Sequence, residues 1–84
     1  MYNIQPFNIT FGSTTKVATM VNLGYNYKAF QTTLPFDVTY YSADYQILGA
    51  ENKTLDEAVV ALWGTDDTYI IDAMASAVGV TIIW

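Results

Sequence analysis

Apolar and polar residues alternate along the first fifty positions, in the manner of half-buried β-strands. The stretch Tyr2–Phe11 alternates from Phe7 onward and contains Pro6, which indicates an edge strand or an irregular start. Residues 12–14 (GST) mark a turn, and a second strand is predicted over residues 16–23. One face of this second strand should carry Val17, Thr19, Val21 and Leu23.

The clearest strand of the pattern is Leu34–Tyr41, where four apolar residues alternate with Pro35, Asp37, Thr39 and Tyr41. Residues 42–44 (SAD) predict a tight turn, after which residues 45–50 return as an antiparallel partner. Residues 27–33 fit neither periodicity well, and their structure stays open at this point.

The pattern changes to that of helices after residue 54. Thr54 and Glu57 have the spacing of a capping box, which predicts a short helix over residues 58–63 that Gly64 ends. A strand remains an alternative there because Val59 and Val60 are β-branched. A second helix, capped by Thr65 or Asp66, is predicted from the apolar spacing of Ile70, Ala73, Met74, Ala77 and Val78.

Gly79 should end that second helix, and residues 80–84 are predicted as a short closing strand. We predict that residues 1–84 fold as a single domain. We therefore predict an α+β fold: a small antiparallel sheet or sandwich of about five strands, with one or two short helices near the C-terminus packed on one face.

The low content of charged residues changes the picture from fold to surface. Only 13% of the residues are charged, the net charge is −5, and Cys, His and Arg are absent. Eleven Thr, five Asn and seven Tyr take the place of ions, and such side chains are cheaper to desolvate than Lys or Glu. Either strand propensity explains this composition, or much of the surface is covered by other proteins.

Several kinds of function are disfavoured by the same counts. Three lysines, Lys16, Lys28 and Lys53, give no basic face for nucleic acid or for an anionic membrane. Residues 69–84 are apolar but too few to span a bilayer, and no secretory signal follows Met1. No histidine is present to activate Ser13, Ser42 or Ser76, and a pair of Ser13 with Lys16 is better explained as ordinary surface, so we expect no enzyme.

The acidic doublets Asp56/Glu57 and Asp66/Asp67 are explained as charges at helix starts rather than as acid–base pairs. The chain has neither an EF-hand pattern nor a glycine-rich phosphate loop. We therefore predict no catalytic residue, no cofactor, no metal ligand and no small-molecule substrate.

Aromatic residues are numerous for so thin a core. Phe7, Phe11, Phe36, Tyr40 and Trp63 suffice for the interior. The remaining rings are either covered by a loop of the chain itself or exposed as anchors for a protein partner. The predicted interface residues are Tyr25, Tyr27, Phe30, Tyr41, Tyr45 and Trp84.

Three segments resemble short virion-associated proteins of tailed bacteriophages: residues 9–16 (ITFGSTTK), 63–72 (WGTDDTYIID) and 79–82 (GVTI). The resemblance covers about half of the chain and implies no functional residues. It implies a multi-copy structural protein of the virion, made in the host cytoplasm, in the tail or baseplate rather than on the capsid. Its partners would be itself, as a homo-oligomer, or other virion proteins. The alternative is a small β-rich module that binds a peptide or a carbohydrate.

Overall fold

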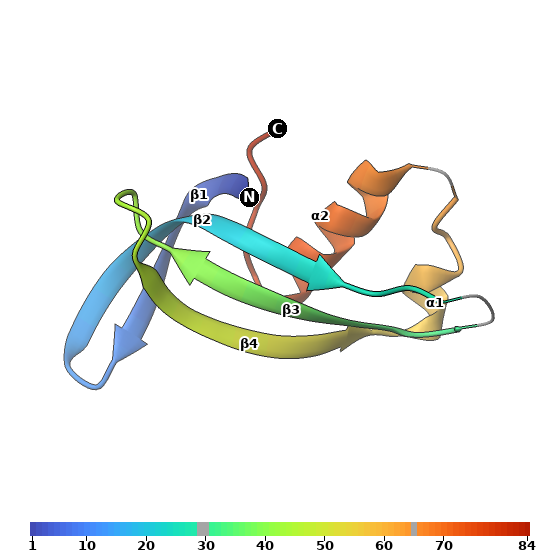
Figure 1. The fold of residues 1–84 in the computed structure, drawn as a ribbon, viewed down its shortest axis with the longest axis horizontal. Coiled ribbons are helices and arrows are strands. Elements are labelled where there is room, and N and C mark those ends of the chain that lie inside the picture. Colours follow the sequence, from blue (N-terminus) through green and yellow to red (C-terminus); the bar gives the residue numbers. More distant parts are fainter. Residues whose placement is uncertain (29–30, 65) are drawn as a thin grey trace.

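The computed structural model describes residues 1–28, 31–64 and 66–84. Four strands form one antiparallel sheet in the order of the chain, and two short helices follow them (Figure 1). The predicted α+β class is confirmed, with four strands in place of five. The elements are β1 (Tyr2–Phe11), β2 (Thr14–Tyr25), β3 (Leu34–Tyr41), β4 (Ile47–Leu55), α1 (Glu57–Val60) and α2 (Asp67–Ala77).

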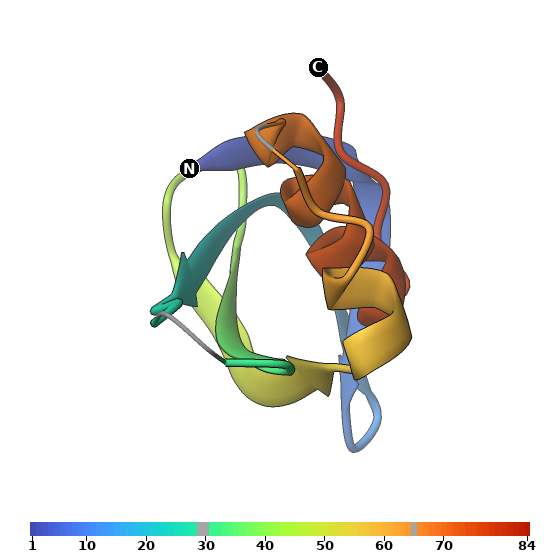
Figure 2. The ribbon, with the colours of Figure 1, turned by 90° about the vertical axis from the view of Figure 1, so that its right-hand side faces the viewer.

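Both helices lie on the same side of the curved sheet (Figure 2). The hydrophobic core lies between the helices and the sheet. Ile70 and Met74 of α2 are fully buried, as is Val38 of the facing strand β3. Predicted packing of the helices on one face is therefore confirmed. Neither of the two described helices covers the opposite face of the sheet.

Strand β2 is shared between two neighbours. Its first part pairs with β1, and its last six residues pair with β3. The β1–β2 register shifts between Asn3 and Phe7, beside Pro6. Ala18 and Val21 are both fully buried although they are three positions apart, a spacing that puts side chains of a regular strand on opposite faces. The prediction of one uniform face for β2 was thus wrong at Val17, which is 46% exposed, because the strand changes the face that it buries at this irregularity.

The β3–β4 hairpin follows the predicted alternation, since Leu34, Phe36, Val38 and Tyr40 are all buried. Strand β4 begins at Ile47, two residues later than predicted, because Tyr45 has a φ of 65° and cannot continue a ladder. The strand also runs past Ala50 to Leu55, where Leu55 pairs with Leu34.

This longer strand overturns the predicted capping box. Thr54 pairs with Pro35 inside β4, and the Asp56 side chain instead accepts a hydrogen bond of 3.0 Å from the Val59 amide. Helix α1 therefore spans Glu57–Val60 rather than residues 58–63, and the strand alternative for Val59 and Val60 is excluded. Pairing of the hairpin fixes where the helix begins.

The second helix agrees with the prediction. The Asp66 carboxylate accepts a 3.0 Å hydrogen bond from the Thr68 amide and caps α2. Gly79 has a φ of 81°, the left-handed conformation expected after the end of a helix.

The predicted closing strand is reduced to a single bridge. Ile82 lies opposite Ile4, with the Gln5 amide donating to the Thr81 carbonyl at 2.9 Å and the Ile83 amide to the Asn3 carbonyl at 2.8 Å. Toward α2 the ladder stops because the Gly79 and Val80 amides donate to the Ser76 and Ala75 carbonyls, in the turn that ends the helix. The sheet therefore has four strands.

Candidate interaction surface

The side chains of β2, β3 and β4 that point away from the helices form a surface that we call the outer face. Cross-strand register places these residues on the same side of the sheet, and all are exposed or partly exposed. Among them, Asp37 is the only residue charged at neutral pH. The outer face comprises Met20, Asn22, Gly24, Pro35, Asp37, Thr39, Tyr41, Ile47, Ala50, Asn52 and Thr54.

One end of the outer face is apolar. Met20 pairs with Tyr41, and Tyr41 pairs with Ile47, which is 67% exposed. The row continues across β1 through Asn3, the partner of Met20, to Ile83 of the tail. We call Met20, Tyr41 and Ile47 the apolar row.

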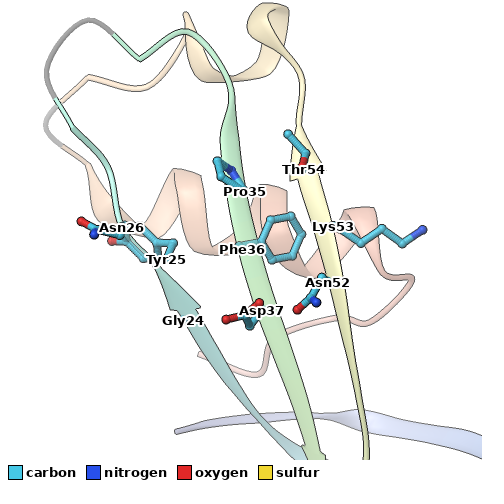
Figure 3. A pocket seen from close by; sticks show the side chains of 9 residues that line it. All are labelled: Gly24, Tyr25, Asn26, Pro35, Phe36, Asp37, Asn52, Lys53 and Thr54. Atoms are coloured by element: carbon cyan, nitrogen blue, oxygen red, sulfur yellow. The ribbon is translucent and has the colours of Figure 1, made fainter.

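The other end is hollowed. Gly24, Asp37 and Asn52 lie side by side in register and help to line a shallow depression of about 660 Å³ (Figure 3). In that view α2 passes behind the strands that carry these residues. A β-carbon added at Gly24 would meet no atom within 4 Å, so the missing side chain itself leaves space. We call these three residues the hollow row.

Two of the predicted interface residues lie at the apolar end. Tyr41 is partly exposed within the apolar row, and Tyr45 is 69% exposed in the turn that follows. That turn is held by Ser42: its carbonyl accepts from the Tyr45 amide at 3.0 Å, and its hydroxyl from the Gln46 amide at 3.2 Å. The hydrogen bonds keep Tyr45 in its left-handed conformation.

Replacing Tyr45 by asparagine should raise the free energy of unfolding by about 0.5 kcal/mol, because Asn adopts positive φ at a lower cost and the exposed ring buries little. Urea unfolding measures the change. Ala43→Asn is the control, since Ala43 lies in the same turn without a positive φ. An equal gain in both variants would show that the backbone conformation of Tyr45 is not strained.

Tyr25 and Tyr27 lie beside Trp63, at the opposite end of the molecule from Tyr45. The ring centroids of Tyr27 and Trp63 are 5.1 Å apart, those of Tyr25 and Trp63 are 6.0 Å apart, and both pairs meet edge to face. Burial, with a smaller contribution from the Asp67 carboxylate, raises the pKa of the Tyr25 hydroxyl. These rings partly cover one another, and both tyrosines remain exposed at their rims. Phe30, the third residue predicted for this region, lies outside the described residues.

Trp84 is 62% exposed but is held in place by its own chain. Its Nε1 donates a 2.9 Å hydrogen bond to the Asp72 carboxylate of α2, and its ring meets Tyr2 edge to face with centroids 5.8 Å apart. The structure thus distributes Tyr25, Tyr27, Tyr41, Tyr45 and Trp84, the predicted interface residues that it describes, over three places rather than one continuous patch.

The inner face of the sheet carries one polar contact within the core. The Tyr40 hydroxyl donates a 2.7 Å hydrogen bond to Glu51 Oε1, and the Tyr40 ring stacks on Phe7 with centroids 5.6 Å apart. Burial, and then the hydrogen bond to Glu51, raise the pKa of Tyr40 well above its usual 10.0. The phenol is therefore a fixed proton donor to the carboxylate, which positions Glu51 rather than activating it.

Most of the other acidic side chains mark helix starts. Asp56 and Asp66 cap α1 and α2, and Glu57 and Asp67 follow in the first turns. Among the described residues, no group of three acidic side chains is arranged to hold a metal ion. In the same part of the chain, no helix has the length and apolarity needed to cross a membrane.

The sequence pattern contained part of the outer face. Alternation in Leu34–Tyr41 already separated Asp37, Thr39 and Tyr41 from the buried positions of the same strand. The alignment of these residues with Met20, Gly24 and Asn52 depends on strand register, which the sequence does not show. The prediction from aromatic residues alone therefore did not include Met20, Gly24, Ile47 and Asn52, which share the outer face with Tyr41.

Comparisons of the chain with protein-family models, with curated proteins and with solved structures found no match. The functional interpretation consequently depends on the surface itself and on the resemblance of the three sequence segments.

Proposed function

We propose that this chain is a structural protein of a tailed-phage virion, present in many copies, which assembles with itself or with other virion proteins. The observation that carries the proposal is the outer face: neither described helix covers it, and Asp37 is the one charged residue among the eleven that form it, with Lys53 at the edge of the depression. The resemblance of three segments to small virion-associated proteins supplies the setting and favours tail or baseplate over capsid decoration.

The physical basis is the cost of removing water from this face. Desolvating a lysine or a carboxylate requires a paired charge on the partner, whereas Thr, Asn and Tyr need only uncharged hydrogen-bond partners and bury apolar atoms as well. The outer face presents Asn22, Thr39 and Asn52 together with the apolar row. The free-energy cost of removing water from such a surface is small when another protein covers it.

A binding module for a peptide or a carbohydrate is the second candidate, and the depression beside Gly24 favours it. Asn26, Asp37 and Asn52 help to line this depression and offer amide and carboxylate groups to a polar ligand. The depression is shallow, however, and ligand sites usually enclose most of their ligand. We therefore place assembly first.

Mass spectrometry of gradient-purified particles tests the proposal. We expect the chain in a fixed ratio to the major tail proteins, at several or more copies per particle, resistant to washing in high salt. Gold-labelled antibody seen by electron microscopy should then mark the tail or baseplate. A chain found only in the lysate supernatant, with measurable binding to a peptide or glycan array as a monomer, would favour the binding module instead.

A further inference from the structure

We propose that the outer face is the contact between two copies of this chain, packed face to face with their strands antiparallel. This inference rests on the proposed function, because it names one partner and the residues through which assembly begins. It follows from the spacing of the outer-face residues, their charge and the area that they offer.

The outer face has a symmetry of its own. A middle row of Asn22, Thr39 and Ala50 lies two residues from the hollow row on all three strands, and two residues from the apolar row on β2 and β3. On β4 a register shift beside Tyr40 and Tyr41 places Ile47 in the apolar row. Two residues along a strand correspond to about 7 Å. The two end rows are therefore at nearly equal distances from the middle one.

In the proposed dimer, a two-fold axis lies between the two sheets, parallel to the middle row and perpendicular to the strands. Rotation about this axis reverses the strand direction and exchanges the apolar row with the hollow row. The apolar row of one copy then lies over the hollow row of the other, as an isologous contact requires. Each strand faces its own equivalent. This arrangement places Met20 of one copy opposite Gly24 of the other. In the same way, Tyr41 lies opposite Asp37 of the other copy, and Ile47 opposite its Asn52.

These pairs are complementary in shape and chemistry. A flexible Met20 side chain fits the space that Gly24 leaves. The Tyr41 hydroxyl is a donor facing Asp37, the one carboxylate of the face, and a charge-assisted hydrogen bond would offset its desolvation. Each contact occurs twice in the dimer.

Charge also favours this face over the others. The chain carries a net charge of −5, and four of its carboxylates, Asp56, Glu57, Asp66 and Asp67, lie at the starts of the helices on the other side of the sheet. The two Asp37 residues of the dimer would be about 14 Å apart along the strands, more than the roughly 8 Å over which charges act at physiological salt. Outer faces can meet without bringing carboxylates together.

The available area indicates a weak dimer. Three to four strands spaced about 4.8 Å apart, over about seven residues of 3.4 Å each, give a footprint of at most roughly 400 Å² per copy. The sheet curves away from the contact (Figure 2), so two copies bury less than the approximately 1,000 Å² of a stable specific interface, as weak and transient contacts do. In a particle with many copies, weak contacts of this kind act together.

Sedimentation of the whole chain over a wide concentration range tests the contact. We expect a concentration-dependent dimer, and Gly24→Gln should weaken it about tenfold or more by filling the hollow. Gly64→Gln is the matched control: it is also free of atoms within 4 Å and lies in the connection between α1 and α2. Both glycines lack a positive φ, so neither change strains the backbone.

A charge exchange tests the pairing itself. Tyr41→Asp places a carboxylate opposite Asp37 of the other copy and should abolish dimers at concentrations where the wild-type chain forms them. Adding Asp37→Lys to Tyr41→Asp should restore them. Residues 37 and 41 are about 14 Å apart within one strand, so rescue reports a contact between copies.

Three results would each overturn the dimer. The first is a wild-type chain that stays monomeric at millimolar concentration, and the second is equal dimerisation of the Gly24→Gln and Gly64→Gln variants. The third is a variant with both Tyr41→Asp and Asp37→Lys that circular dichroism shows to be folded but that does not dimerise. Should Tyr41→Asp not fold, the glycine pair decides alone. None of these results would contradict the proposed virion role, because a chain detected in particles can still pack on a larger virion protein.

Discussion

Met74→Ala should lower the free energy of unfolding by about 3 kcal/mol, close to the middle of the range for large-to-small changes in a core. Met74 is fully buried on α2 and shares the core with Ile70 and with Val38 of β3. Truncation leaves a cavity between the helix and the sheet, and a thin core has few other layers that can close over it.

The relative effect is large because the domain is small. At the usual 0.05–0.15 kcal/mol per residue, 84 residues give a total stability of about 4–12 kcal/mol. With a urea dependence of about 1 kcal/mol per molar, the unfolding midpoint should fall by roughly 3 M. The measurement belongs at low protein concentration, where self-association adds no stability.

Met20→Ala is the matched control, since Met20 is partly exposed on the outer face and its loss should cost less than about 1 kcal/mol. The same variant should weaken the dimer, because Met20 is the side chain placed opposite Gly24. Similar destabilisation by both methionine changes would mean that α2 does not seal the core as described.

The stability of the wild-type chain should decline as pH rises above 10, and Tyr40→Phe should flatten this decline. Burial and the hydrogen bond to Glu51 raise the pKa of Tyr40 in the folded state, whereas an unfolded tyrosine titrates near 10.0. The unfolded chain therefore releases this proton first. Below pH 10 the contribution is fully present, and it is lost as pH rises toward the raised folded pKa.

One proton released on unfolding corresponds to a slope of at most about 1.4 kcal/mol per pH unit. Tyr40→Phe should cost about 1–2 kcal/mol at pH 7, because Glu51 loses its partner in a partly buried place. The difference between the two proteins should then shrink as pH increases. Urea titrations at several pH values between 7 and 11 measure both effects.

Tyr45→Phe provides the comparison, because it removes a hydroxyl from an exposed turn and leaves the contact between Tyr40 and Glu51 in place. Its alkaline decline should match that of the wild-type chain. Tyr25 also has a raised pKa, from burial first, so a residual slope in Tyr40→Phe is expected. A full wild-type slope in Tyr40→Phe would contradict the assignment.

A low-charge surface connects these features to the proposed role. The inner face concentrates the large apolar side chains, while the outer face carries Thr, Asn and a short apolar row. An apolar inner face and a low-charge outer face suit a subunit whose outer face is covered by another protein on assembly. It also predicts that substitutions of outer-face residues affect assembly more than folding.

Local sequence signals were sufficient where a single element decides the outcome. Alternation from Leu34 to Tyr41 predicted the strand and its buried side, because side chains of a strand point to opposite faces in turn. Asp66 and Gly79 predicted the two ends of α2, because capping depends on groups within a few residues of the cap.

Only the tertiary structure decided what depends on pairing between distant segments. Thr54 has the sequence of a helix cap, but pairing with Pro35 keeps it in β4 and moves the cap to Asp56. Residues 80–84 have the pattern of a strand, but the turn at Gly79, whose amide donates to the Ser76 carbonyl at the end of α2, helps to limit them to one bridge. The outer face exists because register aligns Met20, Tyr41 and Ile47, and hydrogen bonding between strands sets that alignment over distances that no local pattern encodes.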